Sequence, residues 1–110
     1  MARPTKKFGR WRITSMEMGD KDFVDEEVPG FIEFKKHGPG EFHFGYVRCD
    51  IDWQEAELGD EPAAEFRFQG FDELEPTSGR GWTMLEDGTI SGVIIFFQRE
   101  ESAFTAKKLN

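Results

Sequence analysis

Phenylalanine is the commonest large apolar residue of this chain, and its spacing is the feature that most restricts the fold. Twelve of the 110 residues are Phe. In several short runs they alternate with other side chains, as in Phe42-His43-Phe44 and Phe66-Arg67-Phe68. Alternation with a period of two places apolar side chains on one face of a β-strand. Since each aromatic ring can bury roughly 150–250 Å², the pattern predicts a small all-β protein with an aromatic core.

Turn-forming residues divide the chain into short strand segments. Asp87-Gly88 between two apolar runs is typical of a tight hairpin, and only residues 20–28 show a helical pattern, with Phe23, Val24 and Val28 on one face. The predicted strands cover residues 8–14, 31–36, 41–57, 64–69, 81–85, 89–97 and 103–106. We therefore expect an antiparallel meander barrel of six to eight strands, with one short helix after the first strand; a β-sandwich is the alternative.

Four irregularities are expected within this framework. The apolar residues change from even to odd numbers after Phe44, which predicts a bulge between Gly45 and Arg48, or else two separate strands. The opposite parity of Met16 predicts a bulge or an exit from the sheet near Ser15. Residues 71–80 are expected to form the longest loop. Two terminal lysines make residues 103–106 typical of an edge strand.

The predicted core and domain limits follow from the same pattern. Residues 1–7 are expected to be a disordered basic tail, and residues 8–110 a single β domain. The expected core consists of Trp11, Phe34, Phe44, Phe66, Phe68, Trp82, Ile94 and Phe96.

Composition restricts the location of the protein and its partners. A formal net charge of −8 argues against direct nucleic-acid binding, which needs positive potential, and favours a basic protein partner. The N-terminus lacks an apolar signal segment, and no apolar run approaches the roughly 20 residues that span a bilayer. Cys49 is the only cysteine, which suits a reducing compartment. These features predict a cytoplasmic protein without membrane contact.

No residue pattern indicates catalysis, a metal or another cofactor. His37 lies in a Gly-Pro turn, and on one extended strand His43 and Cys49 would stand about 20 Å apart. Cys49 itself falls among apolar neighbours, where thiols are inert. Asp50 and Asp52 share a strand face, which we interpret as the polar outside of a barrel and not as a glycosidase pair. No catalytic or metal-binding residue is therefore predicted.

The segment from Asp72 to Trp82 is the strongest candidate for binding. An Arg beside a Trp, facing acids across a turn, can hold a carboxylate or a planar ligand. Asp50 and Asp52, together with Glu55 and Glu57, are expected to alternate outward along one strand as an acidic surface. The predicted ligand or partner site comprises Asp72, Glu73, Glu75, Arg80, Trp82, Asp50 and Asp52.

Two stretches of the sequence resemble known families. Gly9-Arg10-Trp11 resembles the G-x-W that begins the first strand of lipocalins and other calycins. The resemblance implies that the Trp packs across the closed end of a barrel and that an arginine, Arg80 or Arg99, packs on it. Residues 9–13, 30–34, 78–82 and 87–88 also resemble a family of small bacterial proteins of unknown function, which implies a bacterial origin and a single domain.

The function predicted from the sequence is a non-enzymatic binding or protein-interaction module with an acidic surface. The alternative is a calycin-like carrier of a small apolar ligand inside the barrel. The abundance of Phe and Trp favours the first, because a barrel filled with its own side chains leaves little room for a ligand. Strand order and oligomeric state are left open.

Overall fold

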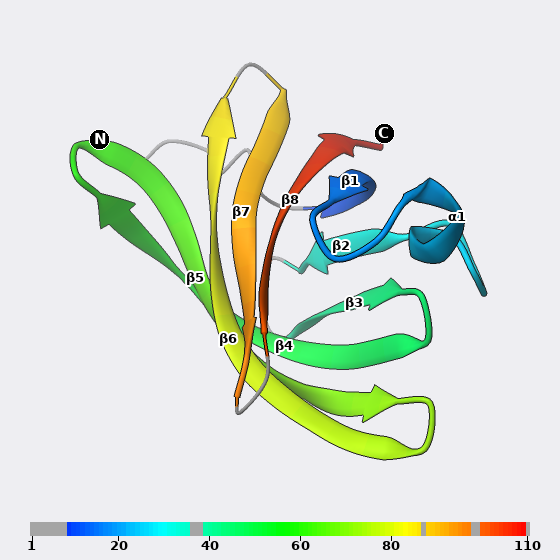
Figure 1. Cartoon of the computed structure of the whole chain (residues 1–110). Helices are drawn as coiled ribbons and strands as arrows, with labels where there is room; N and C mark the ends of the chain where they lie inside the picture. Colours follow the sequence, from blue (N-terminus) through cyan, green and yellow to red (C-terminus); the bar gives the residue numbers. More distant parts are fainter. Residues whose placement is uncertain (1–8, 36–38, 87, 98–99, 110) are drawn as a thin grey trace.

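The described part of the chain forms a β-barrel with one helical turn (Figure 1). The computed structural model describes residues 9–35, 39–86, 88–97 and 100–109. Its helix is α1 (Lys21–Val24), and its eight strands are β1 (Gly9–Met16), β2 (Phe31–Phe34), β3 (Gly40–Phe44), β4 (Val47–Leu58), β5 (Glu61–Asp72), β6 (Glu75–Glu86), β7 (Thr89–Phe96) and β8 (Glu101–Lys108). The predicted tail at residues 1–7 lies outside the described residues.

Every strand pairs antiparallel with the next, and β8 pairs with β1 to close the barrel. The predicted meander barrel with a short helix after the first strand is confirmed. The prediction that residues 103–106 form an edge was wrong, because Ala106 in β8 is paired with Ile13 in β1 and with Ile90 in β7. The lysines of β8 therefore belong to a strand that has a neighbour on both sides.

A tight hairpin explains the phase change after Phe44. Phe44 pairs with Val47, so only Gly45 and Tyr46 connect β3 to β4. Gly45 has a φ of 56°, a left-handed conformation that glycine adopts without a steric penalty. The predicted bulge was wrong and the alternative of two strands is correct. Paired residues face the same side of a sheet, so Phe44 and Val47 both face inward. The inward positions therefore have even numbers in β3 and odd numbers in β4.

A bulge does occur in β1, as the parity of Met16 predicted. The register with β8 shifts between Ile13 and Ser15. The shift allows Ile13 and Met16 to be buried together although they lie three residues apart.

The predicted loop over residues 71–80 was wrong, because β5 and β6 form one long hairpin. Asp72 pairs with Glu75, and the turn consists of Glu73, at a φ of 56°, and Leu74. The inward positions of β6 include Gly79 and Gly81. Because glycine has no apolar side chain, the sequence of β6 does not show the alternation of apolar and polar residues that is typical of a strand.

Aromatic rings fill the barrel from one end to the other. The rings of Phe42 and Phe68 are 5.0 Å apart, those of Phe68 and Phe96 5.3 Å, and those of Phe34 and Phe66 6.2 Å, between ring centroids. Seven of the eight predicted core residues are buried. Trp82 is the exception: its neighbour Gly81 faces inward, so Trp82 lies on the outer face of β6, half-buried.

The helix α1 closes one end of the barrel. Asp20 caps it, its carboxylate accepting a hydrogen bond from the Phe23 N–H at 2.9 Å. Val24 is buried, and the Phe23 ring lies 6.3 Å from that of Phe44. Val28 was expected on the same helical face, but the helix ends at Val24 and Val28 is exposed.

Trp11 is buried in the core near the opposite end, and the cation that contacts it comes from β8. The Nζ atom of Lys108 lies 4.9 Å from the centre of the Trp11 ring. Of the two arginines named as alternatives for this position, Arg80 does not occupy it, since Arg80 is on the outer face of β6. Arg99 lies outside the described residues. In the described part of the chain, no helix has the length and apolar character to cross a membrane.

Candidate functional site

On the outer surface over β1–β3, the charged side chains contact other residues of the chain. Arg12 donates to both carboxylate oxygens of Asp25, at 2.6 and 2.7 Å, and His43 contacts the Glu27 carboxylate at 2.9 Å. The guanidinium of Arg10 lies 3.9 Å from the centre of the Phe31 ring. These charged groups already have partners, so this side offers little to a ligand.

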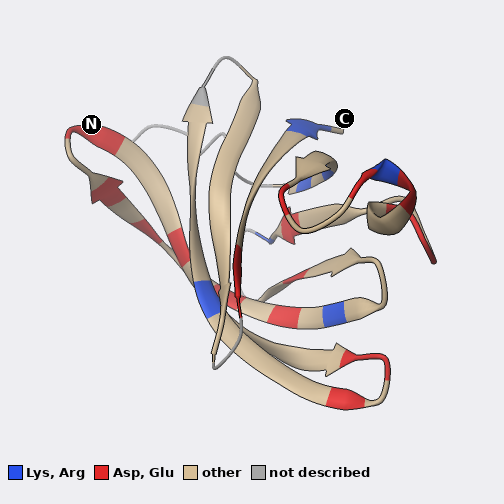
Figure 2. Ribbon diagram, in the orientation of Figure 1, with Lys and Arg blue, Asp and Glu red and all other residues tan. Residues whose placement is uncertain are grey.

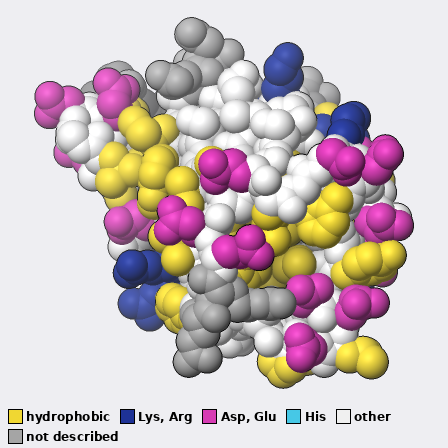
Figure 3. Space-filling view, in the orientation of Figure 1, with side chains coloured by type: hydrophobic (Ala, Val, Ile, Leu, Met, Phe, Trp, Pro, Cys, Tyr) yellow, Lys and Arg dark blue, Asp and Glu magenta, His cyan; other side chains and the backbone are white. Residues whose placement is uncertain are grey.

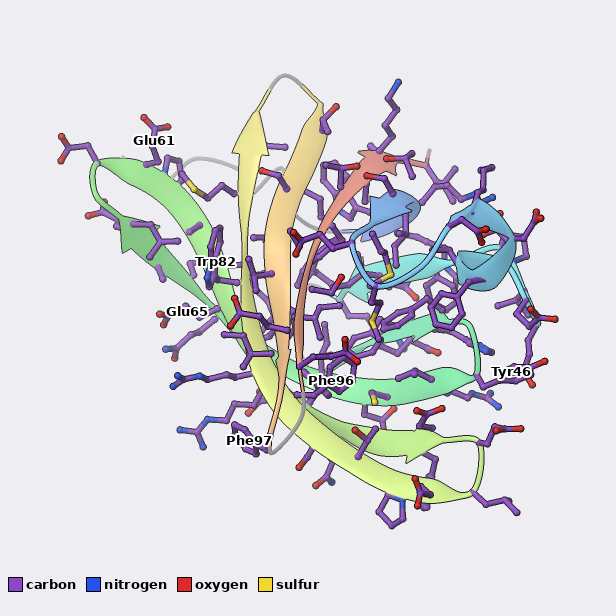
Figure 4. All side chains as sticks on the ribbon, in the orientation of Figure 1. Tyr46, Glu61, Glu65, Trp82, Phe96 and Phe97 are labelled. Atoms are coloured by element: carbon purple, nitrogen blue, oxygen red, sulfur yellow. The ribbon has the colours of Figure 1, made fainter. Side chains whose placement is uncertain are left out.

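The outer surface over β4–β7 is different, because large side chains on it are exposed. Phe71 is 54% exposed and Phe97 is 55% exposed. Figure 4 shows Phe96 directed into the barrel and Phe97 directed away from it. Two grooves lie on this side, and together they contain most of the residues predicted to bind a ligand or partner.

The first groove, which we call the hairpin face, is lined by Asp50, Phe71, Glu75, Pro76 and Phe97 and has a volume of about 860 Å³. Phe71 pairs with Pro76 across the β5–β6 hairpin. The Phe97 N–H donates to the Ser78 carbonyl oxygen at 3.0 Å, which holds this residue against β6. The hairpin face is therefore an apolar surface with carboxylates beside it.

Further carboxylates gather at the same end of the barrel, around Tyr46. The negative charge of Glu26 is the main cause that raises the pKa of the Tyr46 phenol, with desolvation and the charges of Glu73 and Glu27 adding to it. The Glu73 N–H donates to the Tyr46 carbonyl oxygen at 2.9 Å. Three carboxylates, two from the segment after α1 and one from the β5–β6 turn, thus place negative charge around Tyr46.

The second groove, which we call the arginine groove, crosses the middle of β4–β7 and has a volume of about 500 Å³. It is lined by Asp52, Glu65, Arg67, Arg80, Trp82 and Ile95, with four other residues. Arg67 pairs with Arg80 between β5 and β6, so two cations lie side by side. The side chains of these two arginines form no ion pair or hydrogen bond with any described residue.

Three views show what surrounds this groove. Trp82 and Glu65 lie close together on the outer side of the sheet (Figure 4), and β6 carries one band of positive charge (Figure 2). In Figure 3 hydrophobic side chains gather between the tip of the β4–β5 hairpin and β6, with acidic side chains on both sides.

The structure divides the predicted site residues among three places. Asp50 and Glu75 line the hairpin face, Asp72 and Glu73 lie at the β5–β6 turn, and Asp52, Arg80 and Trp82 line the arginine groove. Arg80 does not face the acids across a turn as predicted. It lies five residues along β6 from Glu75, about 17 Å away in an extended strand.

The predicted acidic stripe on β4 was also wrong. Asp50 and Asp52 alternate with buried Cys49 and Ile51 and are on the outer face. Glu55 and Glu57 have the opposite parity and therefore lie on the other face of β4, where the β4–β5 hairpin extends past the shorter strands (Figure 1).

Several residues of the two grooves were missed by the sequence prediction, among them Arg67, Phe71 and Phe97. Arg67 alternates outward between two core phenylalanines, and this signal could have placed it on the outer face. Phe71 and Phe97 gave no such signal, because an apolar residue at a strand end is predicted to be buried.

The described residues show no arrangement typical of catalysis. Burial is the main cause that raises the pKa of the Cys49 thiol to about 12, with smaller contributions from Asp50 and Asp72. Among the described residues, no group of three His, Cys, Asp or Glu side chains could hold a metal ion. His37 lies outside the described residues.

Comparison with known proteins identifies no relative: no protein-family model, curated protein or solved structure matches the chain significantly. The geometry and charge of the hairpin face and the arginine groove are therefore the basis for assigning a function.

Proposed function

We propose that this protein is a non-enzymatic interaction module that binds a basic protein partner through the hairpin face. One observation carries the proposal: Phe71 and Phe97, each more than half exposed, lie in a groove that carboxylates also line. Leaving two large rings in water is unfavourable by about 25 cal/mol for each Å² of apolar area. A partner that covers them recovers this free energy.

The composition of the hairpin face favours a basic partner. Asp50 and Glu75 line the groove, and the carboxylates around Tyr46 extend the negative potential beyond it. Opposite potentials speed association and exclude wrong partners, while aromatic residues at the centre of an interface supply most of the binding free energy. We expect a segment that carries Lys or Arg next to apolar side chains.

Packing inside the barrel supports a binding site on the outside. Ring contacts of 5.0 to 6.4 Å run from Phe34 through Phe66 and Phe68 to Phe42. A carrier of a small apolar ligand needs an internal volume of several hundred Å³, and the contacting rings take up interior space that such a ligand would need. The carrier remains the second candidate, to be separated by experiment.

Peptide binding tests the proposal directly. A fluorescent synthetic peptide in which Lys and Arg alternate with Leu and Phe is titrated with the protein, and its anisotropy is measured. We expect binding that weakens as salt rises from about 0.05 M to about 0.5 M, because screening shortens the range of charge attraction. A peptide with Glu in place of Lys and Arg should not bind.

Two variants locate the binding surface. Asp50→Lys should weaken binding by reversing a charge in the groove, and Phe97→Ser by removing apolar contact. Asp60→Lys is the matched control, since it makes the same charge change at the exposed tip of the β4–β5 hairpin. Peptide binding that is indifferent to salt and to Asp50→Lys would contradict the proposal, and uptake of a lipophilic dye into the barrel would favour the carrier.

A further inference from the structure

Two rows of side chains cross the sheet at the arginine groove. Strand register places residues of neighbouring strands directly opposite each other, and those on the outer face form rows perpendicular to the strands. The first row is Asp52, Arg67, Arg80 and Ile95, on β4, β5, β6 and β7 in that order. The second row, on the same strands, is Gln54, Glu65, Trp82 and Val93.

The two rows are complementary to each other, strand by strand. On β5 the cation Arg67 stands beside the anion Glu65, and on β6 the cation Arg80 stands beside the ring of Trp82. On β7 both rows present an aliphatic side chain. A second copy can be related to the first by a twofold axis that runs across the strands, midway between the two rows. In this arrangement the first row of each copy lies over the second row of the other copy.

From this complementarity we infer that the arginine groove is the interface of a homodimer, in which two copies pack with their sheets face to face. Arg67 of each copy pairs with Glu65 of the other, and Arg80 of each copy lies over Trp82 of the other. Such an interface is isologous, so every contact occurs twice. This inference is independent of the basic partner, since none of its residues lies on the hairpin face.

The charges of the arginine groove favour a second copy of this chain over other binding partners. Asp52, Glu65, Arg67 and Arg80 sum to zero in a chain of net charge −8. Two copies repel each other over the rest of their surfaces, and this neutral surface is a place where they can approach. A purely acidic partner would meet the two carboxylates, and a purely basic one would meet two arginines that have no partner among the described residues.

The side chains of the groove are those that stabilise protein interfaces. Trp and Arg are enriched among the residues that contribute most to binding. A cation over the face of a Trp ring is attracted by the electrons of the ring, and more strongly once water is excluded. Val93, Ile95 and Trp82 are all half-buried in the isolated chain, so contact with a second copy would bury further apolar area.

A charge-exchange experiment tests the dimer. Sedimentation equilibrium measures the mass of the wild-type protein from about 5 μM to about 500 μM, a range that detects micromolar association. We expect the mass to rise toward that of two chains. Arg67→Glu places two carboxylates over each other at both symmetric positions, and Glu65→Arg does the same with two cations. Each variant alone should dimerise at least about tenfold more weakly.

An equimolar mixture of these two variants distinguishes the proposed geometry from a general effect of charge. In the mixed dimer each carboxylate again meets a guanidinium, so association should return to nearly the wild-type level. Arg48→Glu is the matched control, because it makes the same charge change on the outer face of β4 away from both rows. It should associate like the wild type.

Several results would overturn the inference. They are a wild-type protein that stays monomeric over the whole range, single variants that associate like the wild type, or a mixture that does not recover. Circular dichroism of each variant checks that the exposed substitutions leave the barrel folded. Loss of peptide binding at the hairpin face, with the dimer intact, would contradict only the proposed function.

Discussion

Cys49 shows how the position of a residue within a strand determines its chemistry. Its side chain faces inward from β4 and is 2% exposed. Burial disfavours the thiolate, and the pKa of the thiol rises to about 12 as a result. Since the thiolate is the reactive form, we expect Cys49 to be inert in the folded protein.

Thiol labelling tests this expectation. Ellman's reagent should react negligibly with the native protein at pH 8 and rapidly in concentrated urea. The same shift predicts a pH dependence of stability. Above the ordinary thiol pKa of about 8.5, the unfolded chain ionises Cys49 and the folded chain does not, so the free energy of unfolding falls as pH rises further.

A substitution isolates the contribution of the thiol. In Cys49→Ala the decrease in stability above pH 8.5 should be smaller than in the wild type. Native labelling as fast as that of a free thiol would contradict the burial of Cys49.

Residue-level prediction succeeded where strand alternation was clear. Alternation placed Cys49, Phe66 and Phe68 correctly, because one face of each strand is apolar and the other polar. It failed for Trp82, whose parity within the run at residues 81–85 predicted a core position. In the barrel Gly81 faces inward instead, and the end of the Phe66 ring lies 2.5 Å from where a Cβ atom of Gly81 would be.

At the scale of elements, a small network of charge and hydrogen bonds holds the α1–β2 connection against β1. Asp25 lies one residue after α1, and its carboxylate accepts two hydrogen bonds from Arg12 and one from the Gly30 N–H, at 2.9 Å. The hydrogen bonds from Arg12 are the main cause that holds the pKa of Asp25 well below its usual range.

We expect Asp25→Asn to lower the free energy of unfolding by about 1.5–3 kcal/mol at pH 7, the range for hydrogen bonds to charged groups. Because the folded-state pKa is lowered, this contribution is complete above about pH 5 and is lost as pH falls through the folded-state pKa. Urea denaturation at pH 7 and pH 3 measures both effects. The difference between variant and wild type should be smaller at pH 3.

Asp22→Asn provides the matched control for this prediction. Asp22 is an exposed carboxylate in the first turn of α1, so only a small effect of the helix dipole is expected. Equal destabilisation by Asp25→Asn at both pH values would contradict the role of its charge.

The element boundaries were predictable only where the turn residues have a strong signature. The pattern at 86–88 predicted a hairpin, and β6 does end at Glu86 where it pairs with Thr89. The turn at Glu73 and Leu74 contains neither Gly nor Pro, so sequence reasoning extended a loop over residues that are paired. Register was not predictable either, and the arginine groove depends on it, because the register places Arg67 between Asp52 and Arg80.

At the scale of the whole molecule, stability depends on a core in which aromatic rings are the largest buried side chains. Phe66 is 3% exposed, and its ring lies between those of Phe34 and Phe68, with centroids at 6.2 and 6.4 Å. We expect Phe66→Ala to cost about 3–5 kcal/mol, because it removes apolar contact and leaves a cavity that neighbours on a closed sheet cannot fill. Urea denaturation of the purified variant measures this loss.

Phe71→Ala is the matched control, as it makes the same substitution on the same strand at a position 54% exposed. Its effect should stay within about 0.5 kcal/mol. Similar denaturation midpoints for the two variants would show that the core assignment is wrong.

The pairing of β1 with β8 has a consequence for how the chain is made. Trp11 pairs with Lys108, so the first strand of the barrel to leave the ribosome acquires one of its two neighbours only when β8 has been synthesised. Until then the strand edges of β1 and β7 are both open, and the growing chain has a long interval in which it can pair with other chains. Translation must therefore pass all eight strands before the barrel can close, which makes nascent-chain protection more important here than for a fold built from local contacts.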